Sequence, residues 1–288
     1  MSTTLERTAE RELEGSWAPG AEAARGRLRG ALREALPPVG AFVVFAIAWQ
    51  LLVMLLGVPR YLLPTPTDIA GAVVVHGSDL VVALTSTFVS SLLGFGLSIV
   101  VGMLAALVMS HSKLLERSIY PYAIMLQTIP IVAIAPLIVI WVGAGAPAVV
   151  IISFLVSLFP IITNTTAGLT STDHNLMSMF DLYNANFWQR MLKLKLPFAL
   201  PYVMTGLRIS SGLAVIGAIV GEFIAGIGGL RGGLGYVIIS AANRLDMPYL
   251  FASALTSSLL GIIIFVGIGL VSARFLRHWH ESAVRREA

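Results

Sequence analysis

Glu222 is the one acidic residue that lies within or at the edge of a long apolar run of this sequence. An ionisable side chain in apolar surroundings is energetically unfavourable and is by default a candidate for function. The other patterns that could carry chemistry are weaker. No lysine follows the glycine-rich loop 226–235, as a phosphate-binding P-loop requires, and His278 and His280 alone do not make a metal site. We therefore predict no catalytic, cofactor-binding or metal-binding residue.

Long apolar runs dominate the rest of the sequence. The chain has 57% hydrophobic and only 12% charged residues, and its mean hydropathy is +0.86, which excludes an ordinary soluble domain. A membrane-spanning helix needs about 20 apolar residues, whereas barrel strands alternate over about ten. We predict an all-α polytopic membrane protein with about six transmembrane helices, over residues 39–57, 85–109, 119–142, 147–168, 203–224 and 251–273.

The charged residues lie mainly outside these runs. Residues 1–36 read as a cytoplasmic amphipathic or partly disordered arm, 37–274 as the membrane domain and 275–288 as a basic cytoplasmic tail. With a cytoplasmic N-terminus, six spans return the C-terminus to the same side, and 16 of the 19 Lys and Arg residues share that side. This positive-inside bias accounts for the net charge, so we expect a lipid bilayer and no nucleic acid as partner. Short helices over 67–76 and 236–242 are expected at the outer interface.

Prolines and glycines inside the spans mark places where helices bend or pack closely. Pro130 and Pro136 free backbone carbonyls that lipid cannot satisfy, so their faces should turn toward protein or a water-filled path; packing kinks are the alternative. Gly217 and Gly221 have the spacing of a close helix–helix contact. Together with Glu222, these residues are our candidates for a translocation path or gate. The alternative for Glu222 is an interfacial residue that contacts headgroups or loop amides.

A polar stretch, residues 171–203, separates the fourth and fifth apolar runs. From Ser178 to Lys193 its apolar residues recur at helical spacing: Met179, Phe180, Tyr183, Phe187, Trp188, Met191 and Leu192. Near the middle of this pattern, Asn184 and Asn186 predict a bend. Pro197 and Pro201 are expected to end the helix before the fifth span. Large apolar side chains outside the membrane need a surface to cover them, either a groove on a second protein or the chain's own span ends.

The spans are poor in charged groups, and this argues against a carrier powered by protons or sodium, which usually has several near the midplane. Energy should then come from a partner. A secondary carrier is the alternative, and a membrane enzyme a distant third because no catalytic constellation is present. A transporter powered by a partner requires nucleotide hydrolysis by that partner, whereas a secondary carrier does not, so this activity separates the two hypotheses.

From residue 63 to residue 274 the sequence resembles the inner-membrane permease subunits of type I binding-protein-dependent ABC importers, in particular the nitrate/sulfonate/taurine branch. The matching motifs are Leu63-Pro64-Thr65-Pro66, Gln127-Thr128-Ile129-Pro130, Ala135-Pro136-Leu137, Phe159-Pro160, Leu196-Pro197-Phe198-Ala199-Leu200-Pro201 and Thr205-Gly206-Leu207-Arg208. The chain departs at the front of the cytoplasmic loop, where Ser178-Met179-Phe180 replace the family's Glu-Ala-Ala and Asn184 replaces its glycine. Asparagine tolerates the left-handed conformation better than most residues, which preserves the bend.

The resemblance implies a permease in the bacterial inner membrane that is not itself an enzyme. Its partners would be a second permease copy, two ABC ATPase subunits that hydrolyse ATP, and an external solute-binding protein, with alternating access driven by ATPase closure. Carried over to this sequence, the coupling positions are Asn184, Ala185, Trp188, Gln189, Leu196 and Pro197. Residues 214–223 look most like permeases for riboflavin or thiamine-pyrimidine precursors, while nitrate, sulfonate, taurine and bicarbonate are alternative solutes.

Overall fold

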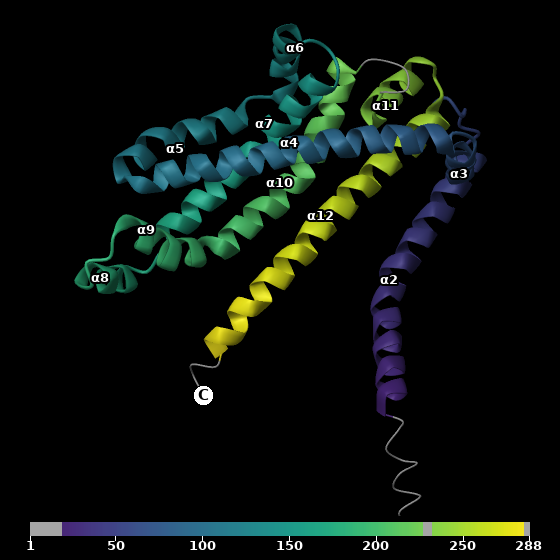
Figure 1. Ribbon diagram of the computed structural model, residues 1–288. Coiled ribbons are helices and arrows are strands. Elements are labelled where there is room, and N and C mark those ends of the chain that lie inside the picture. The colour runs from purple at the N-terminus through teal and green to yellow at the C-terminus, as the bar shows by residue number, and fades with distance from the viewer. Residues whose placement is uncertain (1–18, 227–231, 285–288) are drawn as a thin grey trace, which may run out of the picture. The chain divides into compact units, whose positions relative to one another are not determined.

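The computed structural model of the protein describes residues 19–226 and 232–284, and every regular element in these ranges is helical (Figure 1). The predicted arm up to residue 18, loop residues 227–231 with Arg231, and the tail from residue 285 lie outside the described residues. The helices are α2 (Pro19–Leu55), α3 (Pro66–Val75), α4 (Gly77–His111), α5 (Lys113–Thr128), α6 (Ile131–Val142), α7 (Ala146–Thr170), α8 (His174–Leu182), α9 (Phe187–Arg190), the π-helical turn η1 (Met191–Lys195), α10 (Leu196–Ala225), α11 (Leu234–Asn243) and α12 (Met247–Val284).

The chain divides into two compact units. Helix α2 and the turn residues Thr65–Thr67 form the first unit, and Arg60–Pro64 with the chain from Asp68 onward forms the second. Within the first unit, Gln50 and Thr67 are joined because the Gln50 amide donates to Thr67 Oγ1 (3.2 Å) and accepts from the Thr67 N–H (3.3 Å). This pairing ties the turn after the first apolar helix back onto that helix.

Five helical stretches in the described part of the chain are long and apolar enough to cross a membrane, and a bent pair makes a sixth when counted as one span. They run over Leu36–Leu55, Gly77–His111, Ala146–Thr170, Phe187–Ala225 and Met247–Phe275, with the pair Lys113–Thr128 and Ile131–Val142. The predicted all-α polytopic fold is confirmed. The two short helices expected outside the spans are also present, as α3 and α11.

Two prolines at the start of the first span lie inside a helix. Helix α2 continues through Pro37 and Pro38, because a proline removes a single helical hydrogen bond and bends a helix whose neighbouring turns keep theirs. Pro130 has the larger effect. The predicted third span is two helices, α5 and α6, that meet at an angle of 95°, with Pro130 in extended conformation at the start of α6 (ψ 115°).

Helices α4, α7 and α10 form the centre of the second unit, and they meet around Ser153. A Cβ atom on Gly94 of α4 would lie 2.5 Å from Ser153 Oγ, and one on Gly217 of α10 would lie 2.8 Å from Ser153 Cα. The Ser153 hydroxyl donates to the carbonyl of Ala214 in α10 (2.8 Å). Small residues therefore let three long helices approach at one point, where a hydrogen bond crosses between two of them.

Candidate functional site

Residues 173–195, which we call the loop segment, connect α7 to α10 through α8, α9 and η1. The segment begins at Asp173, whose carboxylate accepts from the Asn175 N–H (2.6 Å) and caps α8. Helix α8 ends before Asn184, which has a φ of 49°, in the left-handed region that asparagine tolerates. The predicted bend at Asn184 is confirmed, and Ala185 follows it directly.

An ion pair closes this bend. Arg190 of α9 contacts Asp181 of α8 (2.5 Å), and its Nε donates to the carbonyl of Ala185 (2.8 Å). Both charged side chains are partly exposed, so the pair adds little stability by itself, but its two bonds fix the angle between α8 and α9. Sequence reasoning missed this pair because its members lie on opposite sides of the bend, outside any regular helical spacing.

A capping box starts the second helix of the loop segment. The Asn186 side chain accepts from the Gln189 N–H (2.8 Å), and the Gln189 side chain accepts from the Asn186 N–H (2.9 Å). This reciprocal arrangement satisfies two amide groups that a helix start otherwise leaves unpaired. Gln189, a predicted coupling position, thus has its side-chain oxygen engaged within the loop segment.

The apolar residues of the loop segment divide into two sets rather than forming one broad face. Leu182, Tyr183 and Trp188 are 83%, 80% and 67% exposed, and they form what we call the exposed apolar set. Met191 is 2% exposed and belongs to a cluster that also contains Leu196 and residues of α4, α7 and α10: Ala106, Leu169, Ala199 and Val203. The buried Met191 anchors the loop segment to the bundle, and the exposed apolar set remains accessible to solvent.

The junction with the fifth span is continuous, which corrects the prediction that Pro197 and Pro201 end the helix. Pro197 lies in the first turn of α10, which directly follows a π-helical turn, and Pro201 lies inside α10. At the π-helical turn, the Leu196 N–H donates to the Met191 carbonyl. The ring of Phe187 also packs edge-on against His111 of α4 (centroids 4.7 Å apart). The loop segment therefore continues into α10 without a break and also contacts α4.

Glu222 lies at the other end of α10 and is 3% exposed. Its Oε2 accepts from the Gly235 N–H at the start of α11 (2.8 Å) and from Thr87 Oγ1 of α4 (2.9 Å). Thr87 Oγ1 in turn accepts from the Leu234 N–H (2.8 Å). A carboxylate at a helix N-terminus is favourable electrostatically, so Glu222 caps α11 and joins three helices. This geometry corresponds to the contact with loop amides that was the alternative for Glu222.

An apolar cavity of about 450 Å³ lies beside the break between α5 and α6. Ile129 and Ile131, on either side of Pro130, line the cavity together with Gln127, Phe159 and Pro160. Sequence reasoning found the break through its proline but not Phe159 as a cavity residue, because an aromatic residue in an apolar run gives no sign of the space beside it.

The structure does not gather the five predicted path residues in one place. Pro130 lies between two residues that line the apolar cavity, whereas Pro136 lies inside α6. Gly217 and Gly221 are buried against α7, where added Cβ atoms would lie 2.8 Å from Ser153 Cα and 3.1 Å from Val149 Cα. The predicted close helix–helix contact of these glycines is confirmed. Their role in a path, like that of Glu222, stays a prediction.

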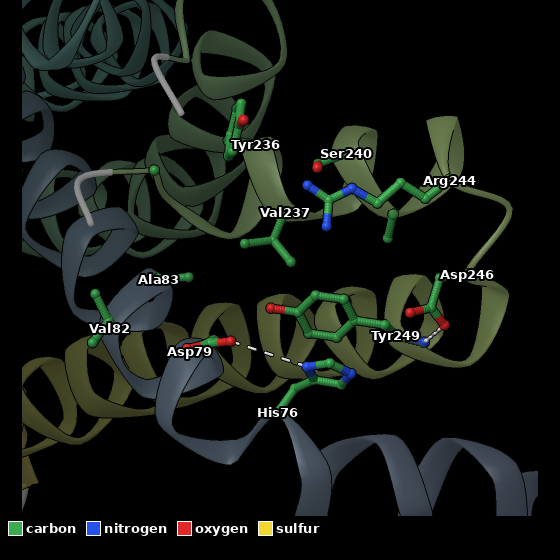
Figure 2. A pocket seen from close by; sticks show the side chains of 12 residues that line it. His76, Asp79, Val82, Ala83, Tyr236, Val237, Ser240, Arg244, Asp246 and Tyr249 are labelled. Carbon is green, nitrogen blue, oxygen red and sulfur yellow. Dashed lines mark hydrogen bonds and ion pairs between the residues drawn. The ribbon is translucent and has the colours of Figure 1, made fainter. Parts of the chain in front are cut away.

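A polar pocket of about 350 Å³ lies at the α11 end of the second unit. Figure 2 shows Arg244, directly after α11, and Tyr249 of α12 in this pocket, with His76 and Asp79 across from them. The rings of His76 and Tyr249 stack with their centroids 4.1 Å apart. Asp246 and Tyr236 also line the pocket, which therefore offers a cation, two acids and three aromatic rings at the opposite end of α10 from the loop segment (Figure 1).

Comparison with known proteins identifies the class to which this bundle of apolar helices belongs. Residues 98–286 match the family of the "binding-protein-dependent transport system inner membrane component". The chain belongs to this family and is a permease component of an ABC importer, as the resemblance implied.

The alignments with similar proteins cover most of the chain. The formylaminopyrimidine transport permease protein ThiX of Halalkalibacterium halodurans is 37% identical over 82% of this chain and 92% of its own length. The riboflavin transport system permease protein RibX of Chloroflexus aurantiacus is 33% identical over 89% of this chain and 96% of its own length. A chain of the inward-facing MetNI methionine ABC transporter has a TM-score of 0.58 at 18% identity, over 69% of this chain and 95% of that chain, which supports the fold alone.

Proposed function

We propose that two copies of this chain form the translocation path of an importer whose power comes from ABC ATPase subunits docked on the loop segment. ATP is hydrolysed by those subunits, and this chain binds no cofactor and catalyses no reaction. Both termini and the loop segment face the cytoplasm, and an external binding protein delivers the solute to the opposite face. The family match and the positive-inside distribution of charge support this assignment.

The exposed apolar set is the observation that carries the proposal. Leu182, Tyr183 and Trp188 protrude from a segment that an ion pair, a capping box and a buried anchor hold in one shape. Large side chains presented on a rigid scaffold are typical of docking surfaces, where aromatic anchors contribute most of the binding energy. A rigid docking element that continues into α10 is also suited to rigid-body switching of the permease halves.

We expect Trp188→Ala to weaken docking of the partner ATPase by at least about 2 kcal/mol, about thirtyfold in affinity, because an aromatic anchor is removed. Copurification of the ATPase with the full permease in detergent measures this loss. Trp188→Phe keeps an aromatic anchor and should restore most of the binding. Trp141→Ala is a matched control, since Trp141 is 74% exposed on α6, away from the loop segment.

Undiminished recovery of the ATPase with Trp188→Ala would contradict the docking proposal, as would an equal loss with Trp141→Ala. The comparison uses single substitutions and leaves Gln189 intact, because removing Gln189 would also break the capping box of α9.

The solute we propose is a nitrogen heterocycle of the pyrimidine or flavin type. The support comes from the ThiX and RibX similarities; the apolar cavity beside Pro130, with Phe159 in its wall, suits a flat, largely apolar ring. Nitrate and aliphatic sulfonates are the alternative, since relatives at 29% and 32% identity carry those names. ATP-dependent uptake by the reconstituted importer, with formylaminopyrimidine, riboflavin, nitrate and a sulfonate compared, decides between them. Uptake without ATP would instead indicate a secondary carrier.

A further inference from the structure

A second polar cavity, of about 540 Å³, lies where the loop segment joins the bundle. Its walls come from the end of α4, the start of α5, the end of α7, the start of α8 and the last residue of η1, so five elements meet around it. We call it the root cavity. None of the residues assigned above to docking or to the path lines it.

The root cavity is positively charged. Lys113, Arg117 and Lys195 line it, and Glu116 is the one acidic residue in its wall. None of these three cations forms an ion pair within 4.0 Å among the described residues. Three cations and one carboxylate leave an excess of positive charge, which attracts an anion small enough to enter the root cavity.

Polar side chains complete the wall of the root cavity. Ser110, Thr170 and His174 line it beside the three cations, and their hydroxyl and imidazole N–H groups can donate hydrogen bonds to an anion.

The position of the root cavity relative to the membrane indicates which kind of anion it binds. Ser110 and Thr170 in its wall lie at the ends of α4 and α7, within two residues of the predicted span limits at 109 and 168. Such ends lie at the level of the lipid headgroups, where basic pockets between helices bind phosphate-bearing lipids. We propose that the root cavity binds a phosphate group, carried by an anionic phospholipid or free in solution. The bound phosphate contacts Lys195 and Arg117 and holds α5, α8 and η1 together.

The test uses the full chain purified in a neutral detergent, with dioctanoylphosphatidylglycerol, dioctanoylphosphatidylcholine and inorganic phosphate as probes. A ligand that binds the folded state raises the Tm by mass action, so thermal shifts at increasing concentration give an affinity. We expect Lys195→Ala to weaken binding about tenfold, because one charge-assisted contact is lost. Lys193→Ala is the matched control: Lys193 is exposed, two positions away, and does not line the cavity.

Stabilisation by phosphatidylglycerol alone, lost in Lys195→Ala and kept in Lys193→Ala, supports the site and assigns it to a lipid headgroup. Stabilisation by inorganic phosphate with the same dependence on Lys195 supports it and assigns a soluble ligand. Arg117→Gln provides the same comparison should Lys195→Ala fail to fold. Equal binding in both lysine variants, an equal response to phosphatidylcholine, or no response to any probe would overturn the proposal. The test contains no ATPase, so its result is independent of the docking proposal.

Discussion

At the scale of single residues, the contact between Glu222 and Thr87 is the one that most clearly joins distant parts of the chain. The Thr87 hydroxyl can donate to Glu222 Oε2 (2.9 Å) or to the Ala83 carbonyl of its own helix (3.1 Å), and its oxygen accepts from the Leu234 N–H (2.8 Å). Gly233 completes the site, since a Cβ atom there would collide with the Glu222 carboxylate. Sequence reasoning identified Glu222 as exceptional but not its partners, because a threonine in an apolar run usually bonds its own helix.

We expect Thr87→Val to lower the free energy of unfolding by about 1–3 kcal/mol, because the Leu234 N–H loses its acceptor and Glu222 loses a donor in a buried site. Thr85→Val is the control, since the Thr85 hydroxyl donates to the Val82 carbonyl of its own helix. Denaturation of the detergent-solubilised protein, followed by circular dichroism, measures both. Similar stability of the two variants would show that the Thr87 contact is dispensable.

At the scale of elements, the close approach of α7 and α10 depends on glycine. We expect Gly217→Ala to destabilise the bundle by about 1–3 kcal/mol, because the new Cβ would lie 2.8 Å from the backbone of Ser153. Gly212→Ala, on the same helix, has nothing within 4 Å of its added Cβ and should be neutral or stabilising by up to about 1 kcal/mol. Thermal unfolding of both variants tests this; an equal Tm would contradict the proposed packing.

The elements themselves were largely predictable, because an apolar run long enough to span a bilayer allows few other structures. The positions of the runs, the short helices outside them and the glycine contact all follow from spacing. What spacing did not predict is how each proline acts. Pro130 separates two helices at 95°, whereas Pro37 and Pro197 leave theirs continuous. A proline removes one helical hydrogen bond in each case, so its presence in the sequence does not by itself distinguish a break from a continuous helix.

At the scale of the whole molecule, the second unit has distinct ends. The loop segment presents the exposed apolar set at one end of α10, and Glu222 fixes α11 beside the polar pocket at the other (Figure 1). One continuous helix, α10, connects the two ends. Both ends could be located in the sequence from their composition. The ion pair and the capping box of the loop segment could not, because they depend on how the chain folds around the bend.

The central claim is that the loop segment faces the cytoplasm and is covered there by the ATPase. The chain contains no cysteine, so Tyr183→Cys places a single thiol at a position that is 80% exposed in the wild-type structure. Labelling with a membrane-impermeant maleimide in oriented vesicles measures both parts of the claim. We predict labelling in inside-out vesicles only, with protection when the ATPase is added. Labelling in right-side-out vesicles, or inside-out labelling unchanged by the ATPase, would contradict the account.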